Sequence, residues 1–357
     1  MGSYSIYPIV YIYAVLFYVL IKGRVGFSLF LLTLFLFAAL RGDVGNDTCG
    51  YQGIYNSFNL AEKRLHFGRI EPVFALINVG LNYIGLGYQS LFVTIAAIQS
   101  VVYFKVYQYV NSNTRWLLVF LVLMYYYAFH INTLRYGLAI IIFSLAFVFY
   151  LNGRKKIAIF VAVLSIGIHV AAAPLLLLFR RDALKFIIIS IFSLLLYDLF
   201  IDKGLVVAKL AYIDYLLNYN LSFNASLGWY IVRKLSLLVA IFWLVRDKYY
   251  KYLFIFFTIG IGTLDAYMPI IGRFSEAYVF ILIVYLSYIG IKKEKIIFLL
   301  PFILLSAYSH IVYPILKGDE ASAKIRQNST KQNVNRSTAK YSFFFEDDQL
   351  VCINLSK

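Results

Sequence analysis

The chain has 357 residues, of which 62% are hydrophobic and 14% charged, and its mean hydropathy is +0.78. This composition excludes an ordinary soluble domain and is typical of a polytopic membrane protein. The formal net charge of +16 does not indicate nucleic-acid binding, because most Lys and Arg residues fall in short connections between apolar runs, as the positive-inside rule predicts.

Apolar runs long enough to cross a bilayer recur along the chain, and each needs about 20 residues as a helix. The first run lacks a basic region before it and a small-residue cleavage site, so we expect it to be retained as a span. We predict an all-α polytopic integral membrane protein with about 10–12 transmembrane helices. The predicted spans are 5–21, 26–40, 89–109, 115–131, 134–151, 157–178, 186–201, 229–245, 250–266, 275–291 and 296–315.

Clusters of basic residues predict which ends of these spans face the cytoplasm. The clusters lie at 22–24, 154–156, 246–251 and 292–295. If these basic clusters face the cytoplasm, the loop 41–71 and the connection 132–135 lie on the outer side of the membrane. This topology requires that the short, glycine-spaced segment 72–87 does not cross, so we expect an interfacial or re-entrant helix there.

Two later segments allow more than one interpretation. The run 157–178 contains His169 and Pro174, and it either forms one span or breaks near the outer surface and turns back. A return would place Arg180 and Arg181 on the cytoplasmic side. The segment 201–229 is amphipathic and rich in Tyr and Asn, which would suit a sugar or an interfacial aromatic belt.

The end of the chain differs in composition from the rest. Residues 317–357 are polar and are expected to be a disordered tail, which leaves 1–316 as the membrane domain.

Three arginines break the positive-inside rule under this topology, namely Arg41, Arg135 and Arg273. Charges at a membrane edge are costly, so three on one face predict a functional site. Arg135 and Arg273 are expected in the first turn of an inward-running helix, where the helix dipole also favours an anion. A guanidinium at that position can bind a phosphate with two hydrogen bonds. The alternative is an arginine held by lipid headgroups or by a neighbouring carboxylate such as Asp265 or Glu276.

Groups that could accept a proton are predicted on the same face. The carboxylates are Asp43, Asp47 and Glu71, and His169 adds an imidazole at a similar depth. A hydroxyl nucleophile needs such a base within hydrogen-bonding reach, although a lone His on an apolar helix is more often structural. His130 is a weaker candidate.

Motifs for nucleotide or metal binding are absent from the sequence, and its two cysteines form no spaced cluster. We therefore expect no metal and no cofactor, and a reaction driven by an activated lipid carrier.

The same residues resemble the EpsG/Wzy family of bacterial polysaccharide polymerases. The resemblance covers residues 5–295 in order, and its specificity comes from order and spacing. The elements that carry it are "ALRGDVGNDTCGYQGIYNSF" (R-x-x-x-G-x-D-x-x-x-Y), "EPVF" (E-x-x-F), "HINTLRYGLAI", "IGIHVAAAPLLLL" and "IGRFSEAYVF". Departures from the family pattern at Asn46, Tyr136 and Ala171 concern fine substrate contacts rather than the class.

The resemblance implies a GT-C-like glycosyltransferase with outer-face loops, acting at the outer face of the bacterial inner membrane. Its donor would be a growing glycan on undecaprenyl pyrophosphate, its acceptor a lipid-linked repeat unit, and a chain-length regulator protein its partner. Alternatives are a lipid-linked oligosaccharide flippase and an O-antigen ligase. The expected roles are pyrophosphate binding for Arg135, Arg41 and Arg273, catalysis for Asp47, His169 or Glu71, and further substrate contacts for Gly45, Tyr51 and Asn132.

Overall fold

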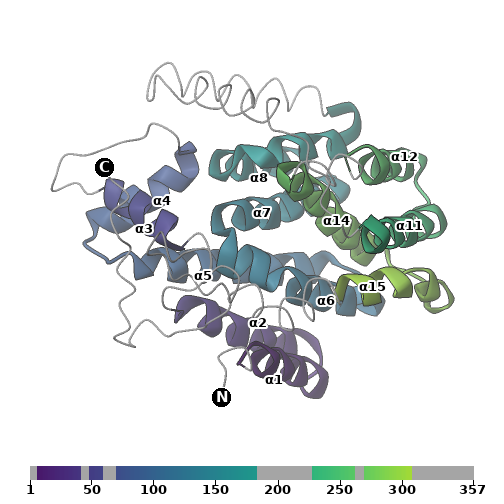
Figure 1. Cartoon of the computed structure of the whole chain (residues 1–357), viewed down its shortest axis with the longest axis horizontal. Helices are drawn as coiled ribbons and strands as arrows, with labels where there is room; N and C mark the ends of the chain where they lie inside the picture. Colours follow the sequence, from purple (N-terminus) through teal and green to yellow (C-terminus); the bar gives the residue numbers. More distant parts are fainter. Residues whose placement is uncertain (1–5, 42–47, 59–69, 183–226, 262–268, 308–357) are drawn as a thin grey trace.

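A computed structural model describes residues 6–41, 48–58, 70–182, 227–261 and 269–307 (Figure 1). All regular structure in these ranges is helical, which confirms the predicted all-α class. The predicted span 186–201, residues 201–226 of the amphipathic segment 201–229 and the tail 317–357 lie outside the described residues.

In the described ranges, the first half of the chain contains eleven helical segments. They are α1 (Ile6–Leu20), α2 (Gly23–Ala39), α3 (Thr48–Ser57), α4 (Pro72–Tyr83), α5 (Gln89–Tyr109), the 3₁₀ turn η3 (Ser112–Thr114), α6 (Arg115–Tyr126), the π-helical turn η4 (Tyr127–Asn132), α7 (Leu134–Leu151), α8 (Lys155–Ile168) and the 3₁₀ segment η5 (Val170–Asp182). The second half contains α11 (Leu227–Leu244), α12 (Lys248–Phe256), the π turn η6 (Phe257–Ile261), α14 (Pro269–Ile289), η7 (Lys293–Phe298) and α15 (Leu300–Ala307).

Three of these helical segments are long and apolar enough to cross a membrane. They are Gln89–Tyr109, Ser112–Asn132 and Leu134–Leu151. By contrast, α4 has 12 residues, so it measures about 18 Å and is too short to cross. This agrees with the expectation that the segment after Glu71 stays on one side.

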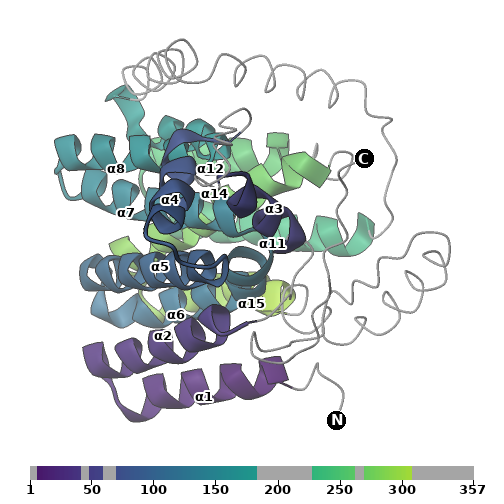
Figure 2. The same ribbon diagram turned by 90° about the vertical axis from the view of Figure 1, so that its left-hand side faces the viewer.

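Five helices from the first half of the chain form a row. Neighbours in the row are α8, α7, α5, α2 and α1, in that order, and both views show this arrangement (Figures 1 and 2). α3 and α4 lie together at one end of the row (Figure 1), and α4 contacts both α5 and α8. α14 packs against α6 and α7, and α11 packs against α15 and α12.

The predicted span 157–178 is two segments rather than one, as its His and Pro allow. α8 ends at Ile168, and η5 then returns to the other end of the bundle, where Lys155 Nζ contacts Asp182 Oδ2 at 2.7 Å. Near that end Arg180 adopts a left-handed backbone conformation with φ of 53°, and its guanidinium pairs with Asp247. The return confirms the hairpin interpretation of this run.

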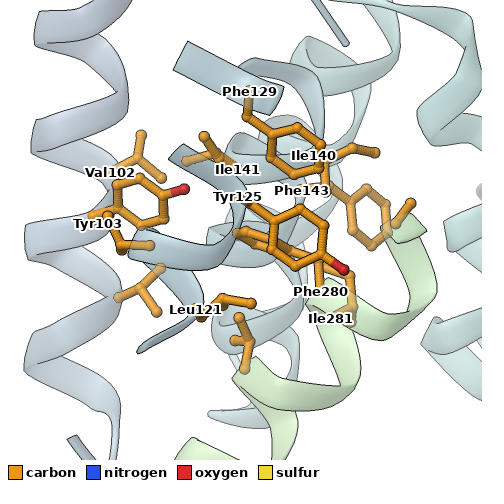
Figure 3. Packing of buried hydrophobic residues seen from close by; sticks show 14 of the residues in the cluster. Val102, Tyr103, Leu121, Tyr125, Phe129, Ile140, Ile141, Phe143, Phe280 and Ile281 are labelled. Carbon is orange, nitrogen blue, oxygen red and sulfur yellow. The ribbon is translucent and has the colours of Figure 1, made fainter. Parts of the chain in front are cut away.

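Aromatic side chains fill the core where η4 meets α7 and α14. Phe129 packs against Tyr125 at a ring distance of 4.8 Å and against Phe280 at 5.5 Å (Figure 3). η4 approaches α7 closely because Gly137 has no side chain, since a Cβ there would lie 2.4 Å from Cβ of Phe129. This packing fixes where α7 begins, and α7 carries Arg135 in its first turn.

Candidate active site

Glu71 lies immediately before α4, and its side chain is completely buried. Pro72 takes the first helical position, where its fixed φ and missing N–H are compatible with a helix start. α4 packs closely on α8 because a Cβ at Gly167 would lie 2.6 Å from Cγ2 of Val73. The Glu71 carboxylate is thereby brought to the end of α8.

Three groups from other elements surround this carboxylate. Arg135 Nη1 lies 3.1 Å from Oε2, the backbone N–H of Val170 donates to Oε1 at 3.3 Å, and His169 Nδ1 lies 3.9 Å from Oε1. A buried carboxylate is costly unless it is paired and hydrogen-bonded. We call Glu71, Arg135 and His169 the Glu71 centre.

Arg135 is held from both its backbone and its side chain. Its backbone N–H donates to the Tyr51 hydroxyl at 3.2 Å, and its guanidinium lies 5.7 Å from the ring centre of Phe74. The side chain is 21% exposed, so it is partly accessible beside the positive end of α7. Both features favour an anionic ligand.

His169 caps the end of α8 in an extended conformation. Its Nδ1 accepts a hydrogen bond from the backbone N–H of Ala171 at 3.1 Å, and its ring meets Tyr136 edge-on at 5.7 Å. An accepting Nδ1 carries a lone pair, so this arrangement assigns the proton of the neutral ring to Nε2. In this state His169 offers a donor at Nε2 rather than a free base at Nδ1.

Arg41 follows α2 and is completely buried. Its Nη1 donates to the carbonyl oxygens of His130, at 3.2 Å, and Ile131 in η4, and its guanidinium lies 4.1 Å from the ring centre of Phe92. The side chain of Gln89 donates to the Arg41 carbonyl oxygen at 2.9 Å. These contacts place the guanidinium against the turn that precedes α7. The predicted pyrophosphate contact of Arg41 stays a prediction.

Two other predicted site residues lie near the Glu71 centre. Tyr51 is buried on α3, and Asn132 is half-buried at the end of η4. Tyr51 contacts the backbone of Arg135, as described above, which makes it a neighbour of the predicted anion site. Gly45 and Asp47 lie outside the described residues, so their roles stay predictions.

One expectation about Arg273 is wrong. α14 begins at Pro269, a residue suited to a first helical position, so Arg273 lies in the second turn and not in the first. The predicted span began later because the apolar run becomes continuous only after Arg273. The structure describes the backbone of Arg273 but not its side chain.

The predicted site does not include a second group of charged side chains on α11 and α14. Arg233 Nη2 pairs with Glu276 Oε1 at 2.7 Å, the Tyr125 hydroxyl donates to Glu276 Oε2, and Lys234 Nζ donates to the Ser275 hydroxyl oxygen. We call Arg233, Lys234, Ser275 and Glu276 the α11–α14 cluster. In the sequence, this cluster is indicated by Arg233 and Lys234, two consecutive cations inside an apolar span. Charges inside a membrane cost free energy, so their presence there indicates a function.

The sequence profile of the EpsG family matches residues 24–321. No curated protein and no solved structure matches the chain.

Proposed function

Because the chain belongs to the EpsG family, we propose that it is a membrane glycosyltransferase that joins the repeat units of a polysaccharide. The family is associated with polysaccharide polymerases, and the apolar helices fit a membrane protein. We further propose that the donor is a growing glycan on undecaprenyl pyrophosphate and that the acceptor is a lipid-linked repeat unit. The reaction would take place at the outer face of the bacterial inner membrane.

The Glu71 centre is the observation that carries this proposal. It combines a partly accessible arginine at a helix start with a buried carboxylate and a histidine. Fixed positive groups are effective where negative charge develops in a transition state. Arg135 would bind the pyrophosphate and stabilise its charge as the glycosidic bond breaks, while Glu71 holds the guanidinium in place.

In the proposed step a hydroxyl oxygen at the non-reducing end of the acceptor forms a bond to the anomeric carbon of the donor. The bond between that carbon and the pyrophosphate oxygen breaks, and its electron pair leaves with the lipid pyrophosphate. The hydroxyl proton passes to a base. We assign this role to Asp47, since His169 presents a donor at Nε2 and the Glu71 carboxylate is occupied by Arg135 and Val170.

The remaining predicted residues have secondary roles in this proposal. His169 would donate from Nε2 to an oxygen of the sugar or the pyrophosphate. Arg41 would act through η4, whose carbonyls it contacts, and Arg273 would approach the pyrophosphate from α14. No metal is needed in this scheme, because guanidinium groups neutralise the leaving group.

Deletion of the gene followed by complementation tests the proposal. A strain without the protein is expected to display single repeat units instead of long glycan on a gel of its surface polysaccharide. Wild-type protein should restore the long chains, whereas Arg135→Ala should not when it is expressed at the same level. The control is Arg115→Ala, which removes an arginine that contacts Tyr107 in another part of the bundle.

The same gel separates the alternatives. Loss of all exported glycan in the deletion strain would indicate a flippase, and long polymer that stays on its undecaprenyl pyrophosphate carrier would indicate a ligase. Unchanged long chains in the deletion strain would refute the polymerase proposal.

A further inference from the structure

The α11–α14 cluster places charges well inside two apolar helices. Arg233 lies six residues after the start of α11 and Glu276 seven residues after the start of α14, which corresponds to about 10 Å along each helix axis. Residues beside Arg233 on α11, such as Val232 and Leu235, are exposed on the outside of the bundle. The charged side chains instead point inward, which is the usual position of functional charges in membrane proteins.

Aromatic rings connect this cluster with the Glu71 centre. The ring of His169 contacts Tyr136 at 5.7 Å, Tyr136 contacts Phe129 at 5.6 Å, and Phe129 contacts Tyr125 at 4.8 Å. The Tyr125 hydroxyl then donates to Glu276. Figure 3 shows Tyr125 and Phe129 side by side next to α14. We call Tyr136, Phe129 and Tyr125 the aromatic wall, and it has an Arg–Glu ion pair at each end.

The two ends of the wall share the features of an anion site. At each end an arginine is paired with a glutamate at hydrogen-bond distance and keeps a small exposed fraction, 21% for Arg135 and 12% for Arg233. The glutamate carboxylate can hold the guanidinium in place, and a phosphate can then bind to the remaining N–H groups of the same guanidinium. At the second end Lys234 adds an ammonium group beside Ser275.

A small hollow adjoins Ser275. Its wall includes the Ser275 and Thr258 hydroxyls among mainly apolar side chains, and it has room for about one water molecule. This space is too small for a sugar ring.

We propose that Arg233 and Lys234 form a second site for a lipid-linked phosphate, distinct from the site at Arg135. This inference rests on the proposed function, because a polymerase must hold two substrates that each carry a phosphate on a lipid. The Glu71 centre would then bind one of them and the α11–α14 cluster the other, with the aromatic wall between the two anions.

Binding of labelled farnesyl pyrophosphate to the full chain tests this proposal without turnover. In phosphatidylcholine nanodiscs we expect the wild type to bind two molecules per chain and Lys234→Met to bind one. Lys234→Met is chosen because it leaves the Arg233–Glu276 pair intact. The matched control is Arg115→Met, which should bind two. If Lys234→Met fails to fold, Ser275→Ala should weaken the same binding event in a folded protein.

Repeating the titration in phosphatidylglycerol nanodiscs separates two sources of phosphate. A site for lipid-linked substrate should still take up farnesyl pyrophosphate, whereas a site for ordinary headgroups would be filled by the anionic lipid. Loss of the Lys234-dependent binding in these nanodiscs would therefore overturn the substrate assignment. Two unchanged binding events in Lys234→Met and Ser275→Ala would refute the second site.

Turnover distinguishes this inference from the proposed function. Loss of one charge-assisted contact is expected to raise KM for one lipid-linked substrate by about tenfold or more, with a much smaller change in kcat. Binding of two probes without any glycan product would refute the polymerase proposal and keep the second site. Normal polymerisation with an unchanged KM in Lys234→Met would refute the second site and keep the polymerase proposal.

Discussion

Replacing Glu71 with Gln removes the charge from the centre of the candidate site while keeping its shape. The carboxylate accepts from Arg135 through one oxygen and from the Val170 N–H through the other. A Gln side chain has one acceptor oxygen, so one of the two donors would face an amide NH₂ group. The substitution therefore removes at least one hydrogen bond to a charged group and leaves a donor poorly paired.

The expected cost follows from these contacts. Hydrogen bonds to charged groups contribute about 1.5–3 kcal/mol each. The 21% exposure of Arg135 lets water replace part of its interaction, so we expect the lower part of this range, about 2 kcal/mol of unfolding free energy. Arg135 would also lose the carboxylate that orients it, and kcat should fall as well.

Reversible denaturation of the protein in detergent micelles measures this effect. Glu71→Gln should unfold at a lower denaturant concentration than wild type, and Arg135→Met should do the same. The double variant should be destabilised by about 1–2 kcal/mol less than the sum of the single effects, because the two residues share one interaction. Glu294→Gln, at an exposed glutamate, is the control and should stay within about 0.5 kcal/mol of wild type.

Additive effects of Glu71→Gln and Arg135→Met would contradict the pairing. The reasoning would also fail if Glu71→Gln were as stable as the Glu294→Gln control, because a buried carboxylate with two donors would then contribute nothing.

Three further perturbations follow from the contacts described above. Gly167→Val should separate α4 from α8, since even a Cβ would lie 2.6 Å from Val73, and polymer formation should fall sharply; Gly80→Ala, where a Cβ meets nothing within 4 Å, should leave polymer formation unchanged. Arg41→Lys should lose one of two carbonyl contacts and lower the unfolding free energy by about 1–2 kcal/mol, with a larger effect on kcat than on KM; an increase in KM alone would instead indicate direct contact with pyrophosphate. Incubation with EDTA should leave polymer synthesis by purified protein unchanged, and a loss restored by added Mg²⁺ would contradict the proposed charge neutralisation by arginines.

Several elements of the fold could be predicted because polar residues bound their apolar runs. The predicted spans 89–109 and 134–151 coincide with Gln89–Tyr109 and Leu134–Leu151, and the predicted span 115–131 lies within Ser112–Asn132. Length and hydropathy are sufficient for such runs. The 3₁₀ conformation of η5 could not be predicted, because a run that is apolar on every side carries no periodicity to distinguish 3.0 from 3.6 residues per turn.

The candidate site was predictable in part. Position relative to the spans places Glu71, Arg135 and His169 on one face, and the structure brings these three together. Sequence could not show which carboxylate pairs with Arg135, since Glu71 lies 64 positions away and depends on the contact between α4 and α8. Nor could it show that Arg41 points into the bundle, because the direction of a side chain after a helix end depends on its packing.

The segment η5 connects the two ends of the bundle. Its amino end is tied to Glu71 through Val170, and its carboxyl end is tied to Lys155 through Asp182. Between these two anchors the helical geometry is interrupted at Phe179 and Arg180. η5 therefore joins the Glu71 centre at one end of the bundle to the Lys155–Asp182 ion pair at the other through two helical pieces rather than one continuous helix.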